Sequence, residues 1–185
     1  MAAGCDPGGP ILVPLDGSVQ AERALAFATP IARRLHQGLC LVQAWGPPNV
    51  VADSVFALGA PVATSDTPYL AGAAYEYGAK LSQAYLTDLA YWLETQGIRA
   101  TWEAKSAFVG RYIREAAESR HASMIVMTSH ARAGIGRVFL GSLTDAVVRA
   151  TGLPVLIVGP RAVPDHLRPL DPRLTVALMG NGILN

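Results

Sequence analysis

Residues 11–18 have the sequence ILVPLDGS, an apolar run that ends in Asp16-Gly17-Ser18. An apolar run of this length is typical of a buried strand. The Asp-Gly pair predicts a turn, and Ser18 predicts the N-cap of a following helix. A strand, a turn and a helix in this order are the building unit of parallel α/β folds.

The same unit repeats along the chain. Further strands are predicted at residues 39–44, 100–105, 124–128 and 154–158. Gly38 is predicted to stop the first helix, and Gly97 the second. A third helix is predicted at about residues 109–119 and a fourth at about 142–150. The apolar faces of the first three helices are expected to be buried. Their residues are Ala24, Leu25, Ala28, Ile31, Ala32 and Leu35 in the first helix, Tyr77, Leu81, Tyr85, Leu89 and Trp92 in the second, and Ile113, Ala116 and Ala117 in the third.

Strands that alternate with helices require crossover connections, which are right-handed and give a parallel sheet. We therefore predict an α/β fold: a five-stranded parallel sheet of order 3-2-1-4-5, with helices on both faces and a C-terminal extension. The predicted domain covers residues 1–160, and residues 161–185 form an arm. Within the arm, residues 174–179 are expected to be an extra strand or a dimer contact, or part of a disordered tail.

The composition excludes several classes of protein. The chain has 185 residues, 51% of them apolar, with a net charge of +1 and no cluster of basic residues, so a nucleic-acid partner is not expected. No apolar run is long enough to span a membrane, and residues 1–10 do not resemble a secretory signal. Cys5 and Cys40 lack metal-ligand spacing and are expected to be reduced thiols of a cytoplasmic protein.

A ligand is expected where the crossovers of the first and fourth strands diverge to opposite faces. The loop of residues 128–142 contains Gly134, Gly136 and Gly141, and the free amides of Leu143 and Thr144 would follow it, an arrangement suited to phosphate. The alternative is that Ser142 and Asp145 only form a capping pair for the helix.

Other side chains near this point have two interpretations each. Asp16 suits ribose hydroxyls or a divalent metal, or it is simply a turn residue. His130, Arg132 and Arg137 are placed to approach phosphates, or they are solvated loop side chains.

Five segments, in the same order along the chain, resemble the universal stress protein family. They are residues 11–18, the run Met124-Ile125-Val126-Met127 that leads into Thr128-Ser129-His130-Ala131, and Phe139-Leu140-Gly141-Ser142 followed by residues 154–158. The resemblance covers about residues 11–159. It implies an adenine-nucleotide site in some members and dimers that pair through the fifth strand.

The nucleotide-binding members are similar in a spacing of Gly, two residues, Gly, nine residues, then Gly and Ser or Thr. On this chain the positions fall on Thr128, Ala131, Gly141 and Ser142, so the spacing is kept and two glycines are replaced. The resemblance implies ATP or AMP, with Asp16 at the ribose or at Mg²⁺ or Mn²⁺ held with the nucleotide, the main chain of Ala44 at the adenine, and Ala107 and Val109 beside it. The full predicted site is Pro14, Leu15, Asp16, Ala44, Val109, Thr128, Ser129, His130, Ala131, Arg132, Gly141, Ser142 and Leu143.

Three functions follow from these observations. The first is a stress-response or signalling protein that binds an adenine nucleotide and forms a homodimer through residues 154–158 and the C-terminal arm. The second is a dimeric interaction module of the same family without nucleotide. The third is an enzyme of a related fold, such as an adenylate-forming ligase, a nucleotide hydrolase or a slow ATPase. It is disfavoured because no Gly-Lys-Ser/Thr loop occurs and residues 128–142 contain no lysine, so the chain is not expected to be an enzyme. The loop of residues 45–68 is expected to flank or cover the pocket.

Overall fold

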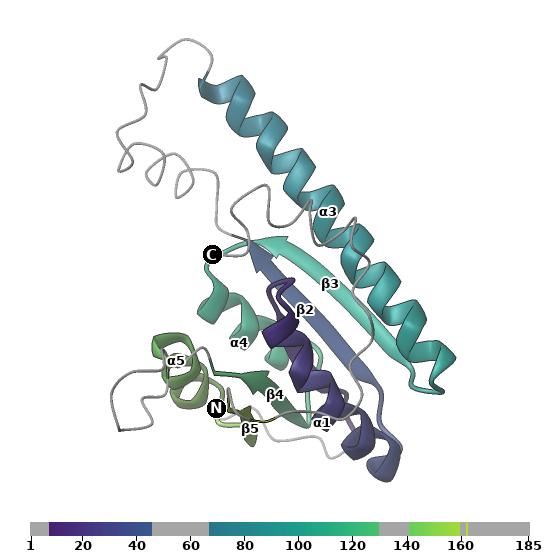
Figure 1. Cartoon of the computed structure of the whole chain (residues 1–185). Coiled ribbons are helices and arrows are strands. Elements are labelled where there is room, and N and C mark those ends of the chain that lie inside the picture. The colour runs from purple at the N-terminus through teal and green to yellow at the C-terminus, as the bar shows by residue number, and fades with distance from the viewer. Residues whose placement is uncertain (1–7, 46–66, 130–140, 160–161, 163–185) are drawn as a thin grey trace.

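The computed structural model describes residues 8–45, 67–129, 141–159 and 162 (Figure 1). The elements in chain order are β1 (Ile11–Leu15), α1 (Val19–Leu35), β2 (Leu39–Trp45), α3 (Thr67–Thr95), β3 (Ala100–Ser106), α4 (Val109–Ser119), β4 (Met124–Thr128), α5 (Ser142–Thr151) and β5 (Val155–Val158). The strands form one parallel sheet of order β3-β2-β1-β4-β5, which confirms the predicted fold and strand order.

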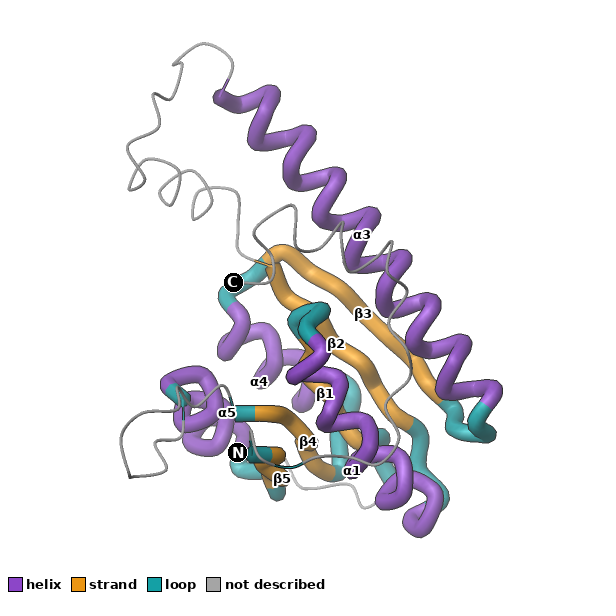
Figure 2. Tube along the Cα trace, in the orientation of Figure 1, coloured by secondary structure: helices purple, strands orange, loops and turns teal. Residues whose placement is uncertain are grey.

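The strand β1 is in the middle of the sheet, and β3 and β5 are its edges (Figure 2). Side chains of successive residues in a strand point to opposite faces. Ile11, Val13 and Leu15 therefore pack on one face, against α1 and α3, while Leu12 packs on the other, against α4 and α5. The two apolar clusters hold the helices on both faces, as the alternating pattern predicts.

The first helix begins as predicted, because the Ser18 hydroxyl accepts a hydrogen bond from the Ala21 amide (3.0 Å). Its end differs. The helix was predicted to stop at Gly38, but it ends at His36, which has the left-handed conformation with a φ of 55°. Gly38 has a different role, because a Cβ there would lie 3.1 Å from the carbonyl oxygen of Arg99.

The prediction that Leu35 and Tyr77 are buried is wrong, because Leu35 is 54% exposed and Tyr77 is 49% exposed. Leu35 is the last residue of α1, where the helix leaves the sheet. The helix α3 has 29 residues, about 43 Å of helix, whereas β3 has seven, about 23 Å of strand. One end of α3 must therefore extend past the sheet, as Figure 1 shows, and Tyr77 is on the half that does so.

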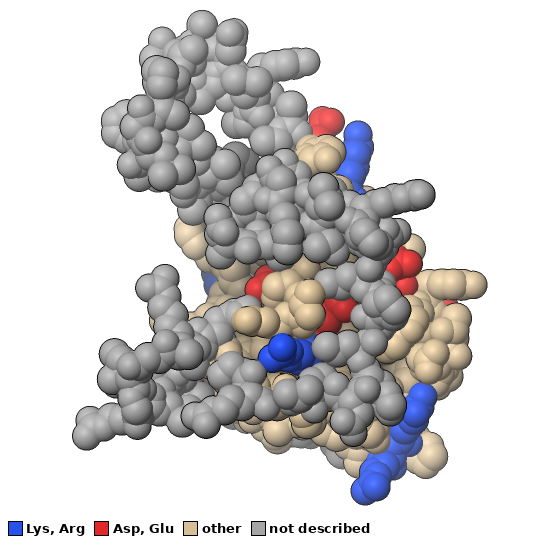
Figure 3. Space-filling model, viewed as in Figure 1, with Lys and Arg blue, Asp and Glu red and all other residues tan. Residues whose placement is uncertain are grey.

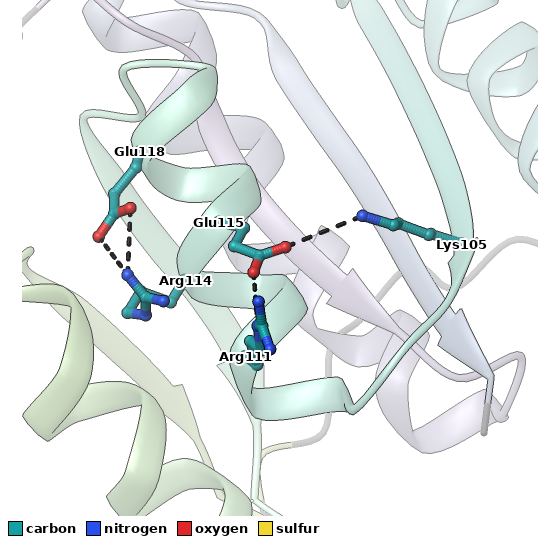
Figure 4. Close-up of polar contacts among 5 residues, drawn as sticks. All are labelled: Lys105, Arg111, Arg114, Glu115 and Glu118. Atoms are coloured by element: carbon teal, nitrogen blue, oxygen red, sulfur yellow. Dashed lines mark hydrogen bonds and ion pairs between the residues drawn. The ribbon is translucent and has the colours of Figure 1, made fainter. Parts of the chain in front are cut away.

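The outer face of α4 is polar and is held by ion pairs (Figure 4). Glu115 accepts from Arg111 (2.7 Å) and lies 3.9 Å from the Lys105 ammonium of β3. Arg114 donates to Glu118 (2.9 Å). In the view of Figure 3, acidic and basic side chains of the described residues are interspersed.

Among the described helices, none is both long and apolar enough to cross a bilayer. Within the same residues, no three metal-ligating side chains gather into a cluster that would hold a metal ion alone.

Candidate functional site

The middle of the sheet opens toward the carboxyl ends of its strands. The strand β1 pairs with β2 along all five of its residues, but with β4 only at Ile11–Met124 and Leu12–Ile125. Beyond these two positions β1 and β4 separate, and β4 and β5 lie at a clear angle to β2 and β3 (Figure 2). β1 and β4 therefore stop pairing at the topological switch point, where open α/β sheets bind their ligands, and the unpaired carboxyl ends of these two strands are called the crevice here.

The turn after β1 is ordered by its own side chains. The Asp16 carboxylate accepts from the Ser18 amide through Oδ1 (2.9 Å), and Gly17 has a φ of 84°, a conformation that favours glycine. The turn interpretation of Asp16 is thus confirmed. It does not exclude a ligand, because a carboxylate has two oxygens and can accept more than one hydrogen bond.

The main chain of Ala44 is placed beside the same crevice. The Ile11 amide donates to the Gly38 carbonyl (3.0 Å), so the even-numbered residues of β2 turn their carbonyls toward β1. At Ala44 this carbonyl points past the end of β1, and no backbone donor among the described residues reaches it. It is an acceptor suited to an amino group such as that of adenine.

The helix α5 begins at the crevice without a capping side chain. Gly141 is its N-cap, and glycine has no side chain that could bond the first amides. The predicted alternative, a Ser142–Asp145 capping pair, is wrong, because Asp145 instead accepts from Arg149 (2.9 Å) and Ser142 is the first helical residue. Among the described residues, no side-chain cap occupies the first-turn amides of α5, which suit an anion.

A second helix start lies next to the first. Phe108 is the N-cap of α4 and makes no capping bond, and a Cβ on Gly110 would lie 3.6 Å from Leu143 of α5. Two helix N-termini without side-chain caps thus meet at this edge. The sequence analysis places Val109, the first residue of α4, in the site, but it does not predict that the amides of this helix start are uncapped, although the absence of Ser, Thr, Asp or Asn at position 108 is a visible signal.

Ser129 supplies a buried hydroxyl where β4 ends. Its amide donates to the Val158 carbonyl (3.1 Å), and the residue is 8% exposed. Its Oγ has no hydrogen-bond partner among the described residues. A buried hydroxyl without a partner costs free energy, so a missing acceptor or donor is expected here.

The apolar side of the crevice is formed by residues that pack on the α4/α5 cluster. Ala44, Ala107 and Leu143 all contact this cluster, and Val109 is 38% exposed at the first turn of α4. Small and partly exposed apolar residues of this kind suit the face of a planar ring.

The structure thus places ten of the predicted site residues at the carboxyl edge of the sheet: Pro14, Leu15, Asp16, Ala44, Val109, Thr128, Ser129, Gly141, Ser142 and Leu143. His130, Ala131, Arg132, Gly134, Gly136 and Arg137 lie outside the described residues, as do residues 46–66 and the arm beyond residue 162. A separate groove of about 570 Å³ lies between α3 and β3 and is lined by Lys80, Gln83, Ala84, Thr87, Asp88, Tyr91 and Trp102.

A parallel sheet of order β3-β2-β1-β4-β5 with helices on both faces is a doubly wound α/β fold. The universal stress protein family matches residues 9–159, and the chain belongs to that family. A universal stress protein of Mycobacterium tuberculosis is 31% identical over 149 residues, which are 80% of this chain and 44% of that protein. The chain therefore spans less than half the length of such curated relatives.

Solved structures share the fold. A universal stress protein from Lactobacillus plantarum superposes with a TM-score of 0.63 at 19% identity, covering 82% of this chain and 97% of that one. A universal stress protein in complex with cAMP gives 0.54 at 20% identity (82% and 96%). One from Archaeoglobus fulgidus in complex with dAMP gives 0.53 at 18% identity (80% and 96%).

Proposed function

We propose that this chain is a stress-response protein that binds an adenine nucleotide, ATP or AMP, in the crevice between β1 and β4. The observations that carry the proposal are the adjacent starts of α4 and α5, whose N-cap residues make no side-chain capping bond, and the buried hydroxyl of Ser129 at the carboxyl end of β4. Backbone amides and a hydroxyl at close range are what a phosphate group requires. Structural neighbours that hold cAMP and dAMP support the same ligand class.

Other residues at the crevice suit the adenine and the ribose of the nucleotide. The carbonyl of Ala44 would accept from the adenine amino group, with Ala107 and Leu143 against the ring. The Asp16 carboxylate, whose Oδ1 already accepts from Ser18, would accept from a ribose hydroxyl.

A divalent cation fits this site only together with phosphate. Mg²⁺ is usually held by one or two carboxylates plus phosphate oxygens and water. Asp16 is the carboxylate that the turn offers, and the described residues contain no cluster that would bind the metal alone. We expect Mg²⁺ or Mn²⁺ to strengthen ATP binding and to have little effect on AMP binding.

Thermal unfolding with nucleotides tests the proposal. A ligand that binds only the native state at 100 times its Kd adds about 2.7 kcal/mol, or roughly 5–10 °C for a chain of this size. We expect such a rise with AMP or ATP and a smaller one with GMP, because guanine has a carbonyl where adenine has its amino group. No rise with millimolar AMP or ATP would favour the interaction module without nucleotide.

We also propose that the chain forms a homodimer in the cytoplasm by pairing its β5 edges. All four residues of β5 are apolar, and Val155, Leu156 and Ile157 are only half-buried. The other edge, β3, has the charged residues Glu103 and Lys105, which protect an edge strand from pairing.

Sedimentation of charge variants tests the dimer. Ile157→Lys should convert a dimer to a monomer, whereas Thr101→Lys on the opposite edge, where Thr101 is exposed, should leave it intact. A dimer that survives Ile157→Lys and dissociates with Thr101→Lys would place the interface on β3 instead.

A further inference from the structure

The middle strand of the sheet contains a proline, which is unusual. Proline has no N–H and is normally confined to edge strands, first residues and bulges. Pro14 is the fourth residue of β1, the central strand, with β2 on one side and β4 on the other.

The direction in which residue 14 faces follows from the hydrogen bonds of its neighbours. The Ile11 amide donates to Gly38, before β2, so odd residues of β1 face β2 and even residues face β4. On β4, the amide of Ile125 donates to Pro154 toward β5, so even residues of β4 face β1. With Leu12 opposite Ile125, an amide at position 14 would donate to the carbonyl of Val126.

Pairing between β1 and β4 ends just before Pro14. The β1–β4 ladder stops at Leu12, although β1 continues to Leu15 and β4 to Thr128. Val126 is 0% exposed, so water does not replace the missing donor at the surface.

We propose that Pro14 is a positioning residue that keeps the crevice between β1 and β4 open, because it lacks the one donor that would join the two strands at this level. The inference deepens the proposed nucleotide site and rests on it for its effect on binding. The effect on strand pairing does not depend on any ligand. Asp16 and Ser129, which follow the open stretch on the two strands, would be drawn together if the ladder continued.

The test is Pro14→Ala, with Pro154→Ala as the matched control. Pro154 is exposed, and its carbonyl already accepts from Ile125. Amide hydrogen exchange followed by NMR should show the new amide at position 14 exchanging at least about a hundred-fold more slowly than an unprotected amide. AMP affinity should fall about ten-fold or more in Pro14→Ala and remain unchanged in Pro154→Ala.

The possible results separate the two levels of the inference. A new amide that exchanges at the rate of an unprotected one would overturn the pairing role of Pro14, whether or not nucleotide binds. A protected amide with unchanged AMP affinity would overturn its role in the site. If the wild-type chain binds no nucleotide, the proposed function fails, and the exchange rate at position 14 still decides whether the proline ends the ladder.

Discussion

The amide of Ser129 donates to the carbonyl of Val158 across 3.1 Å and so joins the residue after β4 to the last residue of β5. The main chain of Ser129 is thus fixed while its hydroxyl, buried beside it, has no partner among the described residues. A fixed, buried hydroxyl at the carboxyl end of a parallel strand is suited to hold a ligand.

Ser129→Ala should weaken AMP binding by about ten-fold, since one hydrogen bond to a charged group contributes about 1.5 kcal/mol. The stability of the ligand-free protein should change little, because the variant removes a hydroxyl that has no hydrogen-bond partner among the described residues. Calorimetric titration and urea unfolding measure the two effects.

Ser123, at the other end of β4, is the control. Its hydroxyl donates to the buried Gln37 Oε1 (3.0 Å). Ser123→Ala should lower the free energy of unfolding by about 1–2 kcal/mol and leave AMP affinity unchanged. If the two variants behave alike, Ser129 is a structural residue and not a ligand contact.

Gly141→Asp should have opposite effects on stability and on binding. Gly141 has a φ of −54° and a ψ of 152°, and a Cβ there would meet nothing within 4 Å, so a side chain fits. Aspartate would cap α5 and interact favourably with its N-terminus, stabilising the protein by about 0.5–1 kcal/mol. The same carboxylate would occupy the amides and repel phosphate.

The affinity for AMP should therefore fall steeply in Gly141→Asp and much less in Gly141→Ala, which adds a Cβ without a capping group. Equal affinities in the two variants would show that the amides of α5 do not bind the phosphate.

The variant Asp16→Asn distinguishes the role of Asp16 in the turn from its proposed role as a metal ligand. The amide oxygen of asparagine can still accept from Ser18, so the free energy of unfolding should stay within about 0.5 kcal/mol of wild type. The enhancement of ATP binding by Mg²⁺ should be lost, since the charged oxygen is gone. An unchanged response to Mg²⁺ in calorimetric titration would exclude Asp16 as the metal ligand.

The raised pKa of Tyr112 leads us to expect a lower free energy of unfolding at high pH. Burial, followed by the charge of Glu103 and a hydrogen bond to it, raises the pKa of Tyr112 well above its usual range. Because the folded-state pKa is raised, its contribution to stability is present below the unfolded pKa of about 10 and is lost as the pH rises above it.

Tyr112→Phe should therefore be less stable than wild type by about 1.5 kcal/mol at pH 7, and the difference should shrink as the pH rises above about 10. Urea unfolding of both proteins from pH 7 to 11 measures this, because the other titrating groups are common to both. A difference that is constant with pH would contradict the assignment.

Most of the fold was predictable because buried parallel strands are continuous apolar runs. Residues 124–128 and 109–119 form β4 and α4 as predicted. The errors are at helix ends: Leu35 and Tyr77 continue an apolar stripe where no sheet remains to cover it. Periodicity identifies the face of a helix but not how far its partner extends.

The site was predictable to the level of strand ends, because parallel topology brings all carboxyl ends to one edge. The start of α4 was predicted through Val109, but its approach to α5 was not, since the contact between Gly110 and Leu143 joins two helices far apart in sequence. Likewise, the spacing of Ser142 and Asp145 fits a capping pair, and it is excluded by the position of Gly141 as the N-cap and by the bond of Asp145 to Arg149.

An NMR titration with AMP tests the central claim most directly. The nucleotide proposal predicts that the amide signals of Ser142, Leu143 and Thr144 shift the most, together with those of Asp16 and Ala44. The signals of the residues that line the α3–β3 groove should not shift. Shifts confined to Lys80, Tyr91 and Trp102, or no shifts at millimolar AMP, would contradict it.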